Sequence, residues 1–99
     1  MKEHPLQSLV LAHLQKRGIF AWRSNTGCAS TKSGGFVRFG LKGQPDVIAV
    51  YKSRFVGIEL KGDTGRQSAE QRTFQAKCEA AGGLYILARA LEDVTDVLR

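Results

Sequence analysis

Cysteines and long apolar runs are scarce in this chain, and each scarcity excludes a class of protein. The two cysteines, Cys28 and Cys78, have the spacing neither of a disulfide framework nor of a metal site, so we expect free thiols in a reducing compartment. No apolar run approaches the roughly 20 residues that cross a bilayer. The start of the chain leads into an amphipathic pattern rather than a signal peptide. We therefore expect a soluble protein whose 99 residues, 1–99, form a single domain.

Acidic residues are also few. Nine Asp and Glu stand against fifteen Lys and Arg, which gives a net charge of +6 and a pI near 9.8. The basic residues are spread along the chain, as is typical of a folded domain with a face that binds a polyanion. A merely soluble basic protein would have the same balance. No zinc pattern and no recognition helix is evident, so sequence-specific reading of DNA is not expected.

The spacing of apolar residues predicts a mixed α/β fold with elements in the order α-β-β-β-β-α-β-α. Phe74, Cys78 and Ala81 are expected to point inward from the second helix. Residues 24–35 are expected to form a long polar loop. The predicted elements are a helix over 5–17, strands over 19–23, 36–39, 46–51 and 55–61, a helix from about 68 to 81, a strand over 84–88 and a helix over 91–98.

Two of these strands predict a hairpin with charged residues at one end. Only residues 52–54 separate the runs 46–51 and 55–61, which suits a tight antiparallel turn and places residues 46 and 60 roughly opposite each other. Side chains alternate along a strand, so Glu59 and Lys61 point the same way, and a small change of register brings Asp46 beside them. Paired carboxylates can bind Mg²⁺ or Mn²⁺, and a nearby lysine can contact a phosphate or an attacking water.

The same residues also have a purely structural interpretation. Glu59 and Lys61 alternate with apolar residues, as they would on the solvated face of an amphipathic strand. The partner run 47–51, however, is apolar on both faces, which is typical of a strand covered on both sides. A carboxylate at the end of such a strand needs a partner or a metal. Both interpretations stay open at this point.

An ordered set of motifs then runs along nearly the whole chain. The motifs are Glu3-x-x-x-Gln7, Gly43-Gln44-Pro45-Asp46, Glu59-Leu60-Lys61-Gly62, Ser68-x-x-Gln71, and Gly82-Gly83 before an apolar strand. The set resembles a VRR-NUC domain, the virus-type replication-repair branch of the PD-(D/E)XK nucleases. The resemblance implies a restriction-endonuclease-like core, a mixed β-sheet flanked by helices. It also implies a role in DNA repair in the cytoplasm of a bacterial or phage-infected cell.

The resemblance further implies hydrolysis of DNA with Mg²⁺ or Mn²⁺ as cofactor, leaving a 5′-phosphate and a 3′-hydroxyl. Asp46 and Glu59 would bind the metal, the carbonyl of Leu60 would be an additional ligand, and Lys61 would be the motif lysine. Glu3 would approach the same centre or a second metal, unless it only precedes the helix and interacts with its positive end.

Two glutamines are also implicated by the resemblance. Gln71 matches the family's helix glutamine and would orient the lysine or a water, whereas with Ser68 it also has the pattern of a reciprocal helix cap. Gln7, one helical turn beyond Glu3, would either support the site or lie exposed.

DNA contacts are expected outside the metal site. Arg23, Lys32, Arg38 and Lys42 flank a Ser/Gly-rich loop and can follow phosphates. Trp22 can stack on a base, although a tryptophan inside an apolar strand more often belongs to the core. Three functions remain: a structure-selective endonuclease similar to homodimeric Holliday-junction resolvases, a monomeric flap or nicking nuclease, and a non-catalytic basic DNA-binding module.

Overall fold

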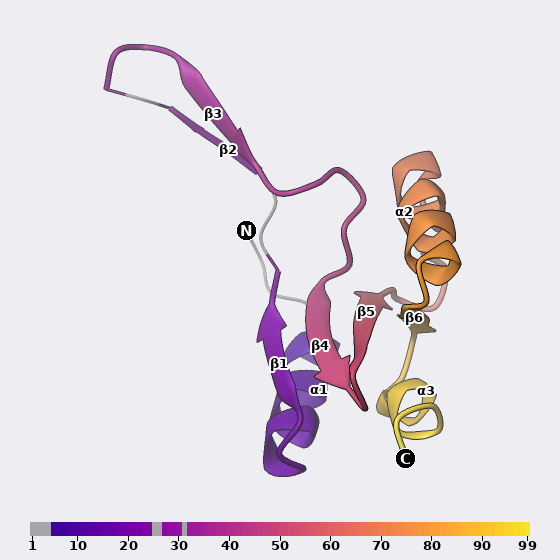
Figure 1. The fold of residues 1–99 in the computed structure, drawn as a ribbon. Coiled ribbons are helices and arrows are strands. Elements are labelled where there is room, and N and C mark those ends of the chain that lie inside the picture. The colour runs from indigo at the N-terminus through magenta and orange to yellow at the C-terminus, as the bar shows by residue number, and fades with distance from the viewer. Residues whose placement is uncertain (1–4, 25–26, 31) are drawn as a thin grey trace.

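The helices and strands of the computed structural model follow the predicted order, with one additional strand. The structure describes residues 5–24, 27–30 and 32–99. Figure 1 labels the elements along the chain. They are α1 (Pro5–Lys16), β1 (Phe20–Arg23), β2 (Gly27–Ser30), β3 (Phe36–Phe39), β4 (Val47–Tyr51), β5 (Arg54–Leu60), α2 (Ala69–Ala80), β6 (Leu84–Ala88) and α3 (Leu91–Thr95).

Four of the strands form one mixed sheet in the spatial order β1-β4-β5-β6. β4 pairs antiparallel with both β1 and β5, whereas β5 and β6 are parallel. Parallel neighbours need a crossover connection, and α2 lies in the one between β5 and β6. The prediction of a mixed sheet flanked by helices is confirmed at this level.

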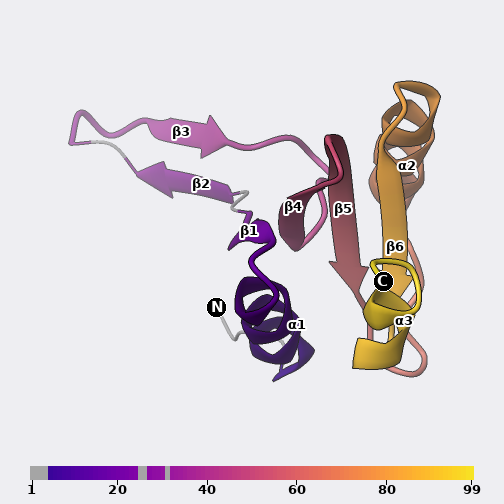
Figure 2. The same ribbon diagram turned by 60° about the horizontal axis from the view of Figure 1, so that its bottom comes forward.

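One face of this sheet carries the hydrophobic core beneath α1 and α3. Figure 2 shows α1 next to β1 and α3 next to β6, in agreement with their packing. Alternate strand residues are buried against inward residues of the two helices. The buried apolar residues are Ala21, Val47, Ala49, Val56, Ile58, Leu60, Ile86 and Ala88 from the strands, and Leu6, Val10, Leu14, Val94 and Leu98 from the helices and the chain after α3.

The opposite face is only partly covered, by α2. The ring of Phe74 in α2 lies 6.4 Å from that of Phe55 and 6.3 Å from that of Tyr85, measured between centroids. These two residues alternate along β5 and β6 with core residues, so α2 lies across the sheet from α1 and α3. No residue of α2 is fully buried.

Two positions that were predicted to be covered are exposed. Ala81 is exposed because α2 ends at Ala80, while Phe74 and Cys78 are half-buried. Val50 of β4 is exposed, since α2 packs on β6 and does not extend over β4. The last helix, predicted over 91–98, spans only Leu91–Thr95, with Val94 and Leu98 buried and Val97 exposed.

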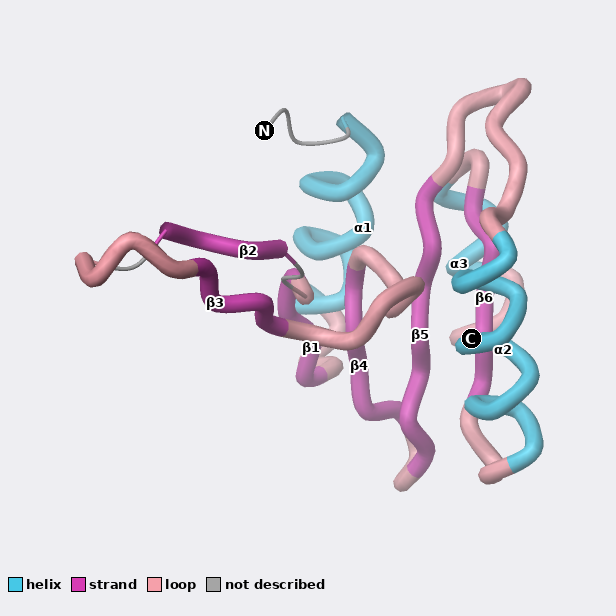
Figure 3. Tube along the Cα trace, turned by 90° about the horizontal axis from the view of Figure 1, so that it is seen from above, coloured by secondary structure: helices cyan, strands magenta, loops and turns pink. Residues whose placement is uncertain are grey.

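The additional strand, β2, lies where a polar loop was predicted. β2 and β3 pair antiparallel as a separate two-stranded sheet, from Gly27 opposite Phe39 to Ser30 opposite Phe36. The composition of β2, Gly-Cys-Ala-Ser, has little preference for a strand, so its conformation depends on pairing with β3. Figures 1 and 3 show this hairpin leaving the sheet on the side of β1, away from α2.

Membrane insertion through a helix was excluded by the sequence, and the structure agrees for the residues it describes. Both α1 and α2 are 12 residues long, and no described helix is long and apolar enough to cross a membrane.

Candidate metal centre

The β4–β5 turn sets which residues meet at the far end of the hairpin. Tyr51 pairs with Arg54, so only Lys52 and Ser53 form the turn. Both have positive φ angles, 50° and 66°, as the two-residue type I′ turn requires. The predicted three-residue turn is therefore wrong, and the register is shifted by one residue.

This shift places the two candidate metal ligands side by side. Val47 pairs with Ile58, so the next position along each strand sets Asp46 opposite Glu59 rather than opposite Leu60. Directly opposite residues of an antiparallel pair have their Cβ atoms about 5 Å apart. The sequence prediction that Asp46, Glu59 and Lys61 converge is supported by this register.

The segment before Asp46 is fixed by close packing on the sheet. Gly57 has no side chain, and a Cβ there would lie only 2.8 Å from the Cγ of Pro45, so the buried proline ring packs directly on the β5 backbone. Gly43 has a positive φ of 77°, and a Cβ there would lie 2.3 Å from the carbonyl oxygen of Glu70. These two glycines let residues 43–45 fit between β5 and α2.

Hydrogen bonds then hold Asp46 itself. Its carboxylate Oδ2 accepts from the backbone N–H of Leu60 at 2.7 Å. Its carbonyl oxygen accepts from the N–H of Ser24 at 3.0 Å and from the side-chain amide of Gln7 at 3.4 Å. Ser24 also donates from its hydroxyl to the carbonyl of Pro45. Of the two predicted environments of Gln7, the structure supports contact with the site.

Glu59 is the only charged residue that is fully buried in the described part of the chain. Its Oε1 accepts from the hydroxyl of Tyr85 and, at 3.1 Å, from the side-chain amide of Gln67. Its Oε2 is buried and has no hydrogen-bond partner within the described residues. A buried carboxylate oxygen without a donor is costly, because it has lost its hydration.

The ammonium of Lys61 lies beside this oxygen. Its Nζ is 3.7 Å from Oε2 of Glu59, and the lysine side chain remains 20% exposed. The lysine therefore contacts both the buried carboxylate and the solvent. This is the position from which a cation can reach an incoming phosphate.

Tyr85 serves this carboxylate as a hydrogen-bond donor. Burial raises the pKa of its hydroxyl far above the usual value, and the hydrogen bond to Glu59 and the negative charges of Glu59 and Asp46 act in the same direction. The hydroxyl thus keeps its proton at physiological pH and continues to donate to Oε1.

Sequence reasoning missed Gln67 and Tyr85 as neighbours of Glu59. Gln67 donates to Glu59 and, at 2.9 Å, to Oε1 of Gln75 in α2. Gln71, by contrast, forms the predicted cap: its Oε1 accepts from the N–H of Ser68 at 2.8 Å, and its own N–H donates to the Ser68 hydroxyl at 3.1 Å. A catalytic role for Gln71 stays a prediction. The parallel register of β5 and β6 pairs Tyr85 with Gly57, two residues from Glu59 on the same face of the sheet, and no local motif predicts that register.

The donor set fits a hard divalent cation. Among the described residues, no group of three or more His, Cys, Asp or Glu side chains lies close enough to hold a metal. Two carboxylates are present, Asp46 and Glu59, and one buried carboxylate oxygen lacks a donor. Mg²⁺ is usually bound by one or two carboxylates together with waters and substrate phosphates. The carbonyl of Leu60 remains a predicted ligand, and Glu3 lies outside the described residues.

The predicted DNA-binding residues lie around the site and along the β2–β3 hairpin. Arg23 ends β1, Lys32 is exposed at the tip between β2 and β3, and Lys42 is exposed in the loop that leads to Asp46. Arg38 belongs to β3, and its side chain falls outside the described part of the structure, as does that of Cys28. The prediction of a free thiol is confirmed for Cys78.

Comparison with known proteins adds no family or relative. No protein-family model matches the chain. No curated protein matches it either.

Proposed function

We propose that this protein is a metal-dependent DNA endonuclease of the PD-(D/E)XK type with a restriction-endonuclease-like core. One observation carries the proposal. Asp46 and Glu59 are neighbours across two strands, and the buried Oε2 of Glu59 has no donor within the described residues and lies 3.7 Å from Lys61. The mixed sheet with α1 and α2 on opposite faces is compatible with that core.

The chemistry follows from the charge of the substrate. A phosphodiester is an anion that repels a nucleophile, and a bound Mg²⁺ or Mn²⁺ would neutralise charge and lower the pKa of a water. Asp46 and Glu59 would hold this ion. The Leu60 N–H fixes the Asp46 carboxylate, and Tyr85 and Gln67 fix that of Glu59 through Oε1, which leaves Oε2 facing the site.

Lys61 would act on the phosphate. A partly exposed ammonium beside a buried carboxylate can hydrogen-bond a non-bridging phosphate oxygen or the attacking oxygen, where negative charge grows in the transition state. Its ion pair with Glu59 keeps it close to the reacting group before substrate arrives.

We infer further that the substrate is branched DNA. The net charge of +6 favours a polyanion, and exposed Lys32 and Lys42 lie on segments that project from or border the site. A homodimeric Holliday-junction resolvase is the first candidate. A monomeric flap or nicking nuclease is the alternative.

The decisive experiment is cleavage of labelled junctions, flaps, nicked and linear duplexes with Mg²⁺, Mn²⁺, Ca²⁺ or EDTA. Asp46→Asn and Glu59→Gln keep the hydrogen-bonding shape of each side chain and remove its charge. We expect both variants to lose cleavage in Mg²⁺ and to retain folding and DNA binding. Lys61→Ala should be severely impaired as well.

The matched control is Glu92→Ala, which removes an exposed acid on α3, across the sheet from the site. It should cleave like the unaltered protein. Ca²⁺ should support binding better than turnover, because its looser coordination poorly positions the attacking water. Near-normal turnover by Glu59→Gln at saturating Mg²⁺, or full activity in EDTA, would refute the proposal.

A further inference from the structure

A contiguous apolar patch lies on the same face of the sheet as Glu59. Phe20 pairs with Val50, and Val50 pairs with Phe55, so the three side chains form a row across β1, β4 and β5. Trp22 follows Phe20 on the same side of β1. The side chains are 69%, 45%, 39% and 40% exposed for Phe20, Val50, Phe55 and Trp22 respectively. The expectation that Trp22 belongs to the core is therefore wrong, because none of the described helices covers this half of the face.

Three of these four residues are aromatic, and two of them are packed together. The ring centroids of Phe20 and Trp22 lie 4.8 Å apart, with 41° between the ring planes. Mutual contact fixes the two rings while their outer surfaces remain accessible. Exposed aromatic rings on a sheet are suited to stacking with flat, unpaired bases.

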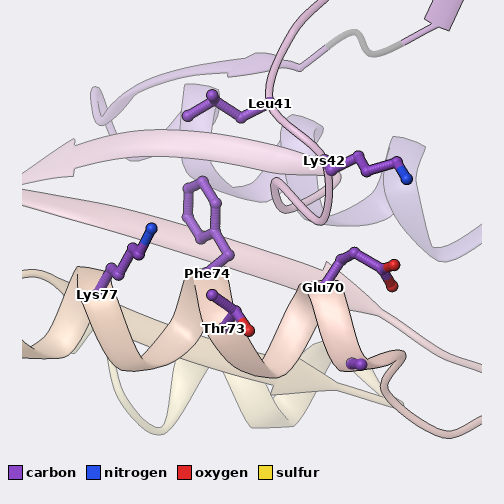
Figure 4. Close-up of a pocket in the computed structure, with 7 residues that line it drawn as sticks. Leu41, Lys42, Glu70, Thr73, Phe74 and Lys77 are labelled. Carbon is purple, nitrogen blue, oxygen red and sulfur yellow. The ribbon is translucent and has the colours of Figure 1, made fainter.

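An apolar hollow continues the patch beyond Phe55. It has a volume of about 400 Å³ and lies between β5, the loop at Leu41 and α2. Figure 4 shows the adjoining pocket, which shares Leu41, Phe74 and Lys77 with this hollow and is also lined by Lys42 and Glu70; Phe74 and Lys77 extend there from α2 towards the strands. The remaining lining residues are Ser53, Arg54, Phe55, Cys78, Ala81, Gly82 and Gly83.

The charges of the residues that line the hollow indicate which kind of partner it can bind. Its lining residues include two cations, Arg54 and Lys77, and no acid. The guanidinium of Arg54 is fixed at the rim, since its Nε donates to the carbonyl of Gly82 at 2.9 Å. An apolar aromatic surface with a cationic rim complements a chain of flat bases joined by phosphates.

We propose that Phe20, Trp22 and Phe55 form a stacking platform for the unpaired bases of a single DNA strand, with Arg54 and Lys77 contacting its phosphates. Phe55 and Glu59 project from the same face of β5, about 13 Å apart at the rise of a β-strand. The platform thus lies beside the candidate metal centre. The inference rests on the proposed nuclease function only for the use of the bound strand, not for the binding itself.

Two other occupants fit the patch less well. Duplex DNA hides the faces of its bases within the stack, so it offers phosphates but no stacking surface to Phe20 and Trp22. A second copy in a two-fold dimer through this face would bring the same patch on both chains together, including Arg54 and Lys77 of each. Like charges would then meet at the rim, which opposes such a contact.

The test uses the intact protein in EDTA, so that binding is measured without cleavage. Trp22 is the only tryptophan of the chain, and its fluorescence therefore reports on the platform directly. An oligothymidylate of about 12 nucleotides, within the range of known single-strand sites, should quench this fluorescence. A duplex of the same length should quench it little.

Variants separate stacking from general attraction. Phe20→Ala should weaken oligothymidylate binding about tenfold, the loss expected for one stacked base, and leave duplex binding unchanged. Leu9→Ala, which truncates an exposed apolar residue on α1 across the sheet, is the matched control and should change neither. Lys77→Gln should reduce the slope of log affinity against log salt by about 0.7, the value for one phosphate contact on a single strand.

Equal loss of single-strand and duplex affinity in Phe20→Ala, or no quenching by the oligothymidylate, would overturn the proposal. A dimer that Phe20→Ala converts to a monomer with unchanged oligothymidylate affinity would overturn it too, and would assign the patch to a second copy. Because no arm requires metal or cleavage, failure of the nuclease assay leaves this test unaffected.

Discussion

At the scale of single residues, Glu59 has the most unusual environment of the described chain. It is fully buried, yet one carboxylate oxygen accepts two hydrogen bonds and the other accepts none from the residues that the structure describes. Burying a carboxylate is strongly unfavourable unless partners replace its hydration. A bound cation at this site would offset the desolvation cost of the buried carboxylate. The Lys61 ammonium, 3.7 Å from Oε2, already offsets part of it.

Tyr85 gives the first prediction at this scale. Tyr85→Phe removes the hydroxyl that donates to Oε1 of Glu59 and keeps the ring that packs near Phe74. Residues that orient a metal ligand typically contribute 10- to 100-fold in metal affinity. We expect Mn²⁺ binding, measured by calorimetry or electron paramagnetic resonance without DNA, to weaken about tenfold.

Tyr51→Phe is the control for this change. Its hydroxyl donates to the carbonyl of Arg99, away from the site. Mn²⁺ affinity should not change in this variant. Equal Mn²⁺ affinities of Tyr85→Phe and the unaltered protein would mean that Tyr85 does not position Glu59.

At the scale of elements, local signals in the sequence were reliable where they depend on neighbours in the chain. The α2 cap is an example, since both hydrogen bonds of the Ser68–Gln71 pair are present. The hairpin turn is a local exception: its register was predicted one residue off because Lys52 and Ser53 adopt positive φ, which neither residue type favours. Features that depend on distant segments were predicted less well. The exposed face of β4 depends on where α2 packs, and the sequence of β4 does not reveal that.

The α2 cap gives the second prediction. Gln71→Ala removes the acceptor for the Ser68 N–H and should lower the free energy of unfolding by about 0.5–1 kcal/mol in urea denaturation. Gln71→Glu keeps an acceptor and adds negative charge near the positive end of α2, so stability should be unchanged or higher. Thr73→Ala, at an exposed position of the same helix, is the control for helix propensity.

The same variants distinguish the two roles of Gln71. Cleavage by Gln71→Glu, normalised to its folded fraction, reports on chemistry alone because the cap is preserved. If Gln71→Glu retains cleavage, Gln71 acts only in the helix cap. Lost cleavage at unchanged stability would add a role at the metal site, and a less stable Gln71→Glu protein would contradict the capping argument.

At the scale of the whole molecule, the described part of the chain is a small core with an attached hairpin. The β2–β3 hairpin extends the longest dimension to 48 Å, against 30 and 28 Å in the other directions. An isolated two-stranded hairpin is marginally stable in water. It projects beyond the sheet with Lys32 at its tip, and we expect contact with DNA or another chain to stabilise it.

The last prediction is dimerisation on a surface other than the Phe20–Trp22 platform. Resolution of a four-way junction needs two incisions on symmetry-related strands, and each chain contributes one Asp46–Glu59 pair. A two-fold dimer would place two such pairs symmetrically about the junction centre. Burial of apolar surface against a partner would also stabilise so small a core.

We expect light scattering to give about twice the monomer mass of 10.9 kDa and junction cleavage to give paired, symmetric cuts. Phe20→Ala should leave that mass unchanged, since the dimer would not use the platform. A strictly monomeric protein that cuts flaps and leaves junctions intact would instead support the monomeric flap nuclease.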